Sequence, residues 1–354
     1  AFTWPDAVTL RTGSGQMNIN GAQTMVANNL TLTTNSNLAI NGAISSTGTL
    51  TIGGASTATS IGVGDGQAGT LSLTDAELDN LQSGFSSVII GATNVTGAIN
   101  IAGRTWNNNM DFRTNTGALN INGAQNMGAN NLILRTNTDL VINQILAGTG
   151  TLSILNSGTA AGNSMAVGTT QSGQLKLTDA ELGFITGQGW TTLAFGNNGS
   201  AGVLNVDAKS WAENVIFRNG AGTLSINGVQ TMAAGKNLTI TSNGDIALNF
   251  AVDGTGTLTF GPSAATATFG VGDGQAGPVH LSNAELARIS ANWNLLTFGT
   301  TVTTTSTYGT MGVANLNWNH NVRFLNNLQA MSIAGATMAA GKNLTIETNG
   351  TLNI

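Results

Sequence analysis

The chain consists of short stretches in which apolar and mostly polar residues alternate, separated by Gly, Asn, Ser and Thr. An apolar residue, a middle residue and a second apolar residue form the period-two pattern of a half-buried β-strand. Alternate stretches lie roughly 20 to 22 residues apart, which is the length of one coil of a parallel β-helix. Examples are Val8–Leu10, Met17–Ile19, Leu30–Leu32, Leu38–Ile40, Leu50–Ile52, Leu71–Leu73, Val88–Ile90 and Ile99–Ile101.

A longer repeat is superimposed on this pattern. Thr74–Leu78 (TDAEL) recurs as Thr178–Leu182 and as Ser282–Leu286 (SNAEL), each time after 104 residues. Tryptophans recur in the same phase, at Trp4, Trp106, Trp211 and Trp318. We therefore predict an all-β, parallel β-helix solenoid with about five coils in each repeat. It forms one continuous domain over residues 1–354, with repeats at 1–102, 103–207 and 208–314 and a partial repeat at 315–354.

The alternative architecture is a row of antiparallel sandwiches of roughly 100 residues each. Such domains need longer strands and frequent hairpin turns, with strands typically of about 5 to 6 residues. The short and evenly spaced stretches of this chain favour the solenoid.

Composition agrees with a chain that buries a regular core beneath a neutral polar surface. Hydrophobic residues make up 41% of the chain and charged residues only 8%, whereas disordered chains have the opposite bias. The net charge is −5, and the 11 Lys and Arg residues are scattered, so we expect no nucleic-acid partner. No apolar run reaches the roughly 20 residues of a membrane helix, so we expect no membrane insertion.

The recurring TDAEL element carries the pattern of a capping box, in which a Thr or Ser and a Glu three residues later satisfy free N–H groups at a helix start. The pairs are Thr74 with Glu77, Thr178 with Glu181, and Ser282 with Glu285. We therefore interpret each Glu as a helix cap rather than a catalytic acid, and we predict a short helical turn at each element.

The recurring tryptophans have two interpretations. Trp4, Trp106, Trp211 and Trp318 each recur in register beside an apolar strand, which favours packing over sugar stacking. Phe85, Trp190 and Trp293 form a second recurring set, at steps of 105 and 103 residues. We keep Trp190 and Trp293 as candidate glycan contacts, although packing explains them better.

Two further features suggest chemistry but do not support it. The Gly62–Gln67 and Gly270–Gln275 loops resemble calcium-binding turns, but Gly168–Gln171 lacks the aspartate in the equivalent place. His280 and His320 do not recur, and we interpret both as surface residues. The chain has no Cys, which removes thiolate metal sites and agrees with export of an unfolded chain. We therefore expect no cofactor, no metal and no enzymatic activity.

The strand style, the TDAEL element, the following apolar strand that ends in Gly and the Gly97–Ile101 stretch together resemble the repeats of giant bacterial surface exoproteins. They are similar to filamentous-haemagglutinin-like adhesins of the two-partner secretion type. The resemblance implies a right-handed solenoid, an extracellular or bacterial cell-surface location, and adhesive or scaffolding work.

The sequence thus predicts an extracellular structural or adhesive rod. The chain begins at a Trp-bearing position and ends inside a repeat, so we expect a fragment of a longer polypeptide or a subunit that assembles end to end with itself. Host or matrix glycans are the other expected partners. The alternatives are a carbohydrate-binding adhesin module, a β-helical polysaccharide-degrading enzyme with clustered acidic residues, and a phage fibre.

Overall fold

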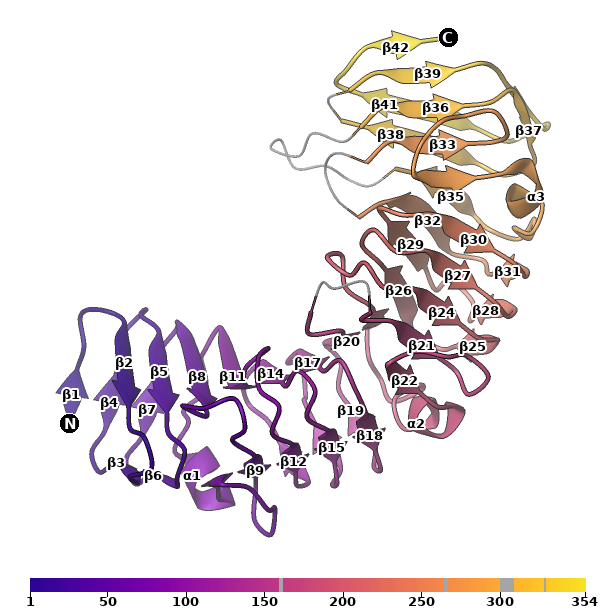
Figure 1. The fold of residues 1–354 in the computed structure, drawn as a ribbon. Helices are drawn as coiled ribbons and strands as arrows, with labels where there is room; N and C mark the ends of the chain where they lie inside the picture. The colour runs from indigo at the N-terminus through magenta and orange to yellow at the C-terminus, as the bar shows by residue number, and fades with distance from the viewer. Residues whose placement is uncertain (159–161, 264–266, 300–308, 328) are drawn as a thin grey trace. The chain divides into compact units, whose positions relative to one another are not determined.

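The computed structural model describes residues 1–158, 162–263, 267–299, 309–327 and 329–354. The chain divides into two compact units. Unit 1 contains residues 1–158 and 177–191, and unit 2 contains residues 159–176 and 192–354. Figure 1 shows that each unit consists of short strands stacked coil upon coil.

In unit 1, seven parallel strands form the main sheet, and each is contributed by one coil. They are β2 (Val8–Arg11), β5 (Leu30–Thr33), β8 (Thr49–Gly53), β11 (Ser87–Gly91), β14 (Met110–Arg113), β17 (Leu132–Arg135) and β20 (Thr151–Leu155).

The other faces of unit 1 carry shorter strands, which we group as a second and a third face. The second face contains β3 (Met17–Ile19), β6 (Leu38–Ile40), β10 (Leu71–Leu73), β9 (Ile61–Val63), β12 (Ile99–Ile101), β15 (Leu119–Ile121) and β18 (Leu140–Ile142). The third face contains β1 (Phe2–Thr3), β4 (Gln23–Thr24), β7 (Ile44–Ser45), β13 (Arg104–Thr105), β16 (Gln125–Asn126) and β19 (Leu146–Ala147). Two helical turns, α1 (Asp75–Asp79) and α2 (Asp179–Gly183), complete the unit, and β22 (Leu175–Leu177) precedes α2.

Unit 2 follows the same plan. Its main sheet contains β23 (Thr192–Phe195), β26 (Asn214–Arg218), β29 (Leu238–Ser242), β32 (Thr257–Pro262), β35 (Leu295–Phe298), β38 (Val322–Asn326) and β41 (Leu344–Thr348). Its second face contains β21 (Met165–Val167), β24 (Leu204–Val206), β27 (Leu224–Ile226), β30 (Ile246–Leu248), β34 (Val279–Leu281), β33 (Phe269–Val271), β36 (Met311–Val313), β39 (Met331–Ile333) and β42 (Leu352–Asn353). Its third face contains β25 (Lys209–Trp211), β28 (Gln230–Met232), β31 (Val252–Asp253), β37 (Leu316–Trp318) and β40 (Ala336–Met338), with α3 (Asn283–Leu286) beside it.

The core of each unit is a set of side-chain ladders. Alternate residues of each strand point inward because successive side chains of a strand lie on opposite faces, and the in-register pairing places like residues above one another. In unit 1 one such ladder is fully buried and consists of Leu30, Leu50, Val88, Met110, Leu132 and Leu152. The prediction of an all-β parallel solenoid is confirmed, whereas its right hand and its repeat boundaries stay predictions.

The prediction of five coils in each repeat is wrong, because four main-sheet strands complete one repeat. The third coil is much longer than the others. The first repeat has register pairs Val8 with Leu30, Leu30 with Leu50, Leu50 with Val88, and Val88 with Met110, which give coils of 22, 20, 38 and 22 residues. In unit 2 the corresponding steps from Val215 to Leu238, Leu258, Leu296 and Val322 are 23, 20, 38 and 26 residues.

The long coil is explained by a strand that returns to its own sheet. β9 continues into β10, which pairs beside it in parallel with Leu71 opposite Ile61, only ten residues later. Parallel neighbours normally need a crossover of a dozen or more residues. Here Gly64 and Gly66 adopt φ values of 88° and 76°, a region in which only Gly is comfortable, and they let a short loop make the return. The evenly spaced triplets do not reveal this extra strand.

Candidate functional site

The corner at which α1 meets the third face is the most elaborated part of unit 1. The predicted capping box is present there. The Thr74 backbone N–H donates to Glu77 Oε2 at 2.7 Å, and the Glu77 N–H donates to Thr74 Oγ1 at 3.3 Å. The same reciprocal bonds join Thr178 to Glu181 and Ser282 to Glu285. These bonds satisfy N–H groups that the first turn of a helix leaves unpaired.

The second carboxylate oxygen of each glutamate has a further partner that the sequence did not indicate. Glu77 Oε1 accepts the backbone N–H of Ile40 at 3.4 Å, and Glu181 Oε1 accepts that of Ile142 at 3.3 Å. In unit 2, Glu285 Oε1 accepts the N–H of Leu248 at 3.1 Å. Each of these N–H groups belongs to the last residue of a second-face strand. The glutamate therefore fixes the helical turn to the preceding coil, and both of its oxygens are engaged.

The aspartates of the glycine loops also bind the helical turns. Asp65 Oδ1 accepts the N–H of Asp75 at 3.1 Å, and Asp273 Oδ1 accepts the N–H of Asn283 at 3.0 Å. The carboxylates on which a calcium interpretation would depend thus cap the first turn of α1 and α3. Within the part of the chain that the structure describes, no three His, Asp or Glu side chains gather as a metal-binding group.

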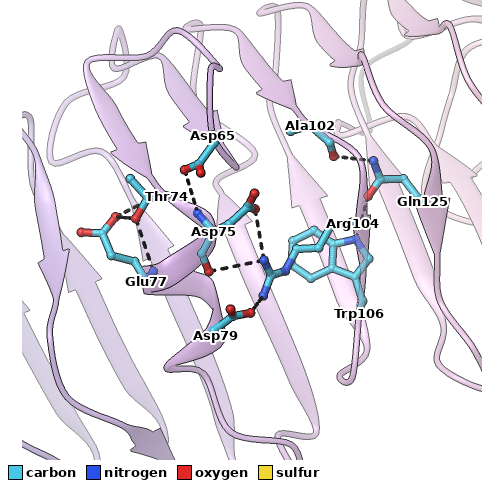
Figure 2. A network of polar contacts seen from close by, with 9 residues as sticks. All are labelled: Asp65, Thr74, Asp75, Glu77, Asp79, Ala102, Arg104, Trp106 and Gln125. Atoms are coloured by element: carbon cyan, nitrogen blue, oxygen red, sulfur yellow. Dashed lines mark hydrogen bonds and ion pairs between the residues drawn. The ribbon is translucent and has the colours of Figure 1, made fainter.

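Arg104 fills the space between α1 and the third face (Figure 2). Its Nη1 donates to Asp75 Oδ1 at 3.1 Å and to the Asp75 carbonyl at 3.4 Å, and its Nη2 pairs with Asp79. The Cζ atom lies 5.5 Å from the centre of the Trp106 ring. Asp75 and Asp79, two carboxylates that converge on one point, are therefore neutralised by an arginine, which leaves no free acid and base pair here for glycoside hydrolysis.

Behind Arg104, Trp106 is held by a glutamine from the next coil, an arrangement that we call the Trp–Gln clamp. The indole N–H of Trp106 donates to Gln125 Oε1 at 2.7 Å, and Gln125 Nε2 donates to the carbonyls of Ala102 and Gly123, both at 2.7 Å. Gln125 is 2% exposed. The clamp thus satisfies all three polar groups and joins two successive coils at the corner.

The same clamp occurs at two of the other recurring tryptophans. Trp4 donates to Gln23 at 2.8 Å, and Trp211 donates to Gln230 at 2.9 Å. Trp211 is fully buried, as packing predicts, whereas Trp4 is half-buried. The recurrence of these tryptophans therefore reflects a repeated structural bond.

The fourth recurring tryptophan has lost its partner. Trp318 is 5% exposed, and Met338 lies opposite it in the register, as Met232 lies opposite Trp211. Ala336 consequently occupies the position of Gln230. The indole nitrogen of Trp318 is buried without a hydrogen-bond partner among the described residues, which is a costly state for a donor.

The proposed glycan contacts at Trp190 and Trp293 are corrected by the structure. Both side chains are 2% exposed. Trp190 donates its indole N–H to the carbonyl of Leu146 at 2.8 Å, and Trp293 donates to that of Val252 at 3.1 Å. A sugar cannot stack on an enclosed ring, so both residues pack the corner beneath a helical turn. Phe85 is buried in the same manner.

The surface assignment of the histidines is wrong for His320, which is 5% exposed and whose Nε2 lies 2.8 Å from the carbonyl oxygen of Ser290. His280 is half-buried, and its Nε2 lies 3.1 Å from the carbonyl oxygen of Gly272. Both rings therefore bind loops of unit 2.

Some carboxylates of unit 2 are electrostatically perturbed. A hydrogen bond from Thr170 lowers the pKa of Asp207, and hydrogen bonds from Ser290 and Asn292 lower the pKa of Asp253. Burial and the nearby Glu285 raise the pKa of Asp245. These shifts arise from loop-fixing bonds and from a like charge, without a second titrating partner in a cleft.

Comparisons with known protein families, with curated proteins and with solved structures find no match to this chain. Among the described residues, no helix has the length and apolar character needed to cross a bilayer. The function must therefore be argued from the geometry.

Proposed function

We propose that the chain is part of an extracellular structural or adhesive rod. The observation that carries this proposal is that the recurring polar residues of the corner bind the chain itself. The Glu of each helical turn and the Gln of each clamp join one coil to the next. Groups that recur for catalysis or ligand binding would be directed at a site, whereas these groups increase cohesion along the stack.

The remaining surface supports the same proposal. Polar side chains bridge successive coils on the outside, for example Asn41 to Asn20 at 2.9 Å and Asn120 to Asn100 at 2.8 Å. The outside is thus polar with few charges, which suits a fibre that works outside the cell at varying ionic strength. The absence of Cys agrees with folding after export without oxidation errors.

Mechanical unfolding of single molecules tests the structural part of the proposal. When the chain is pulled by its two ends, we expect a series of force peaks whose contour-length increments are multiples of one coil, about 20 residues. A chain that extends without force peaks would contradict a load-bearing role.

Protease treatment of intact cells of the native source tests the location. We expect an externally added protease to remove the polypeptide while a cytoplasmic marker remains intact. Protection of the polypeptide until the cells are lysed would contradict a surface location.

A further inference from the structure

A groove in unit 2 occupies the corner that Arg104 fills in unit 1. It lies beside α3, β37 and β40 and has a volume of about 530 Å³. This value falls within the range of small-ligand sites, about 300 to 1,000 Å³. Its floor includes Leu286, Ile289, Leu316 and Met338, and Trp318 and His320 lie at the same end.

The groove is open because the three residues that close the corner of unit 1 are replaced. Leu316 stands two residues before Trp318, as Arg104 stands two residues before Trp106. Asn283 follows the helix cap Ser282 in the place of Asp75, and Ala287 takes the place of Asp79. Without the guanidinium and its two carboxylates, no ion pair ties the helical turn to the third face, and the space between them is free.

The rim of the groove is polar and neutral. Asn317, Asn319 and Thr337 are exposed there, and none of them has a hydrogen-bond partner among the described residues. Side-chain amides and hydroxyls both donate and accept hydrogen bonds. No Asp, Glu, Lys or Arg lines the groove, so it offers no counter-charge to a phosphate, a uronic acid or an ammonium group.

We propose that this groove binds a neutral N-acetylated hexosamine, as a monosaccharide or as the end of a glycan chain. The apolar floor takes the acetamido methyl group and a C–H face of the ring, and the rim bonds the hydroxyl groups. The inference deepens the adhesive part of the proposed function and rests on it, because a surface rod gains attachment from such a site.

The test is a titration of the full chain with N-acetylglucosamine and with N,N′-diacetylchitobiose, followed by the ¹H–¹⁵N signal of the Trp318 indole. We expect a saturable shift with a Kd of about millimolar order for the monosaccharide. Glucose, which lacks the acetamido methyl group, is expected to bind at least about tenfold more weakly, because one methyl group in an apolar pocket discriminates by that much.

Two variants keep the test decisive. The triple substitution Asn283→Asp, Ala287→Asp and Leu316→Arg rebuilds the closed corner of unit 1 and should abolish the shift while the thermal midpoint is kept or rises. Asn319→Ala changes only an exposed rim side chain and should weaken binding without affecting folding. If the triple variant does not fold, Asn319→Ala alone decides between a rim contact and none.

Absence of a saturable shift up to about 100 mM sugar, far above a millimolar Kd, would overturn the proposal, as would a shift that both variants retain. The pulling experiment does not depend on this groove, so failure of sugar binding leaves the rod proposal standing. Conversely, a failed pulling experiment leaves the titration interpretable.

Discussion

Replacement of Gln125 by Ala tests whether the Trp–Gln clamp joins successive coils. The substitution removes three hydrogen bonds at once, one from the Trp106 indole and two to the carbonyls of Ala102 and Gly123. The site is almost fully buried, so water does not readily replace the lost partners. Buried groups left without a partner are costly.

The magnitude follows from these three bonds. At about 1 kcal/mol for each bond, with an additional desolvation cost for the orphaned indole N–H, we expect unit 1 to lose about 3 to 5 kcal/mol of unfolding free energy. With a urea m-value of about 3 kcal/mol/M, the midpoint should fall by roughly 1 to 1.5 M. Native-state hydrogen exchange should show the largest loss of protection in β13 and β16.

Gln16→Ala is the matched control, because Gln16 is exposed and bonds only to Asn18. Its effect should remain within about 0.5 kcal/mol, as is usual for surface substitutions. If Gln125→Ala were as mild as Gln16→Ala, the clamp would not contribute to cohesion, and the recurrence of Gln and Trp would need another explanation.

The remaining predictions concern single side chains. Val26 adopts a φ of 55° where the next repeat has Gly128, so Val26→Gly should raise the thermal midpoint by relieving about 1 kcal/mol of strain and Gly128→Val should lower it; a lower midpoint in Val26→Gly would contradict this. Glu77→Ala removes the cap and the acceptor for the β6 strand end, and urea unfolding should show a loss of about 2 kcal/mol, whereas a loss below about 0.5 kcal/mol would refute the double role. Asp207 and Asp253 have lowered pKa values when folded, so their contribution is complete above the unfolded pKa of about 3.9 and is lost as the pH falls through the lower folded values. Thermal melts between pH 5 and pH 2 should therefore fall less steeply for the double Asn variant than for the wild type, and parallel curves would exclude this linkage.

Periodicity predicted most of the fold because each triplet shows its buried face locally. The stretches around Leu30, Leu50 and Val88 all became strands of the main sheet. The capping boxes were likewise readable, since both partners lie within four residues of each other. Interactions of this kind depend on neighbouring positions and can be inferred without knowing which coil lies above which.

Contacts between coils were harder to infer. The pairing of β10 with β9 depends on a backbone return that no hydrophobic pattern records. Arg104 was missed because its position does not recur, and Phe2, Lys209 and Leu316 stand in its place in the other repeats. A comparison of the residues that differ between repeats, rather than those they share, would have indicated both the closed corner of unit 1 and the open groove of unit 2.

The Trp–Gln clamp was visible in the sequence but was interpreted only as a repeat marker. Gln23, Gln125 and Gln230 each follow a recurring Trp by 19 residues, which is close to one coil. Two polar groups one coil apart on the same face are candidates for a bond between coils, and this signal would have indicated the clamp.

Electron cryo-microscopy of the native material tests the central claim most directly. We predict thin filaments with strands spaced about 4.8 Å apart along the axis, and a longer modulation set by four main-sheet strands per repeat, about 19 Å. Compact isolated particles without an axial strand spacing would contradict a rod and would turn attention to the α3 groove as the working part of the protein.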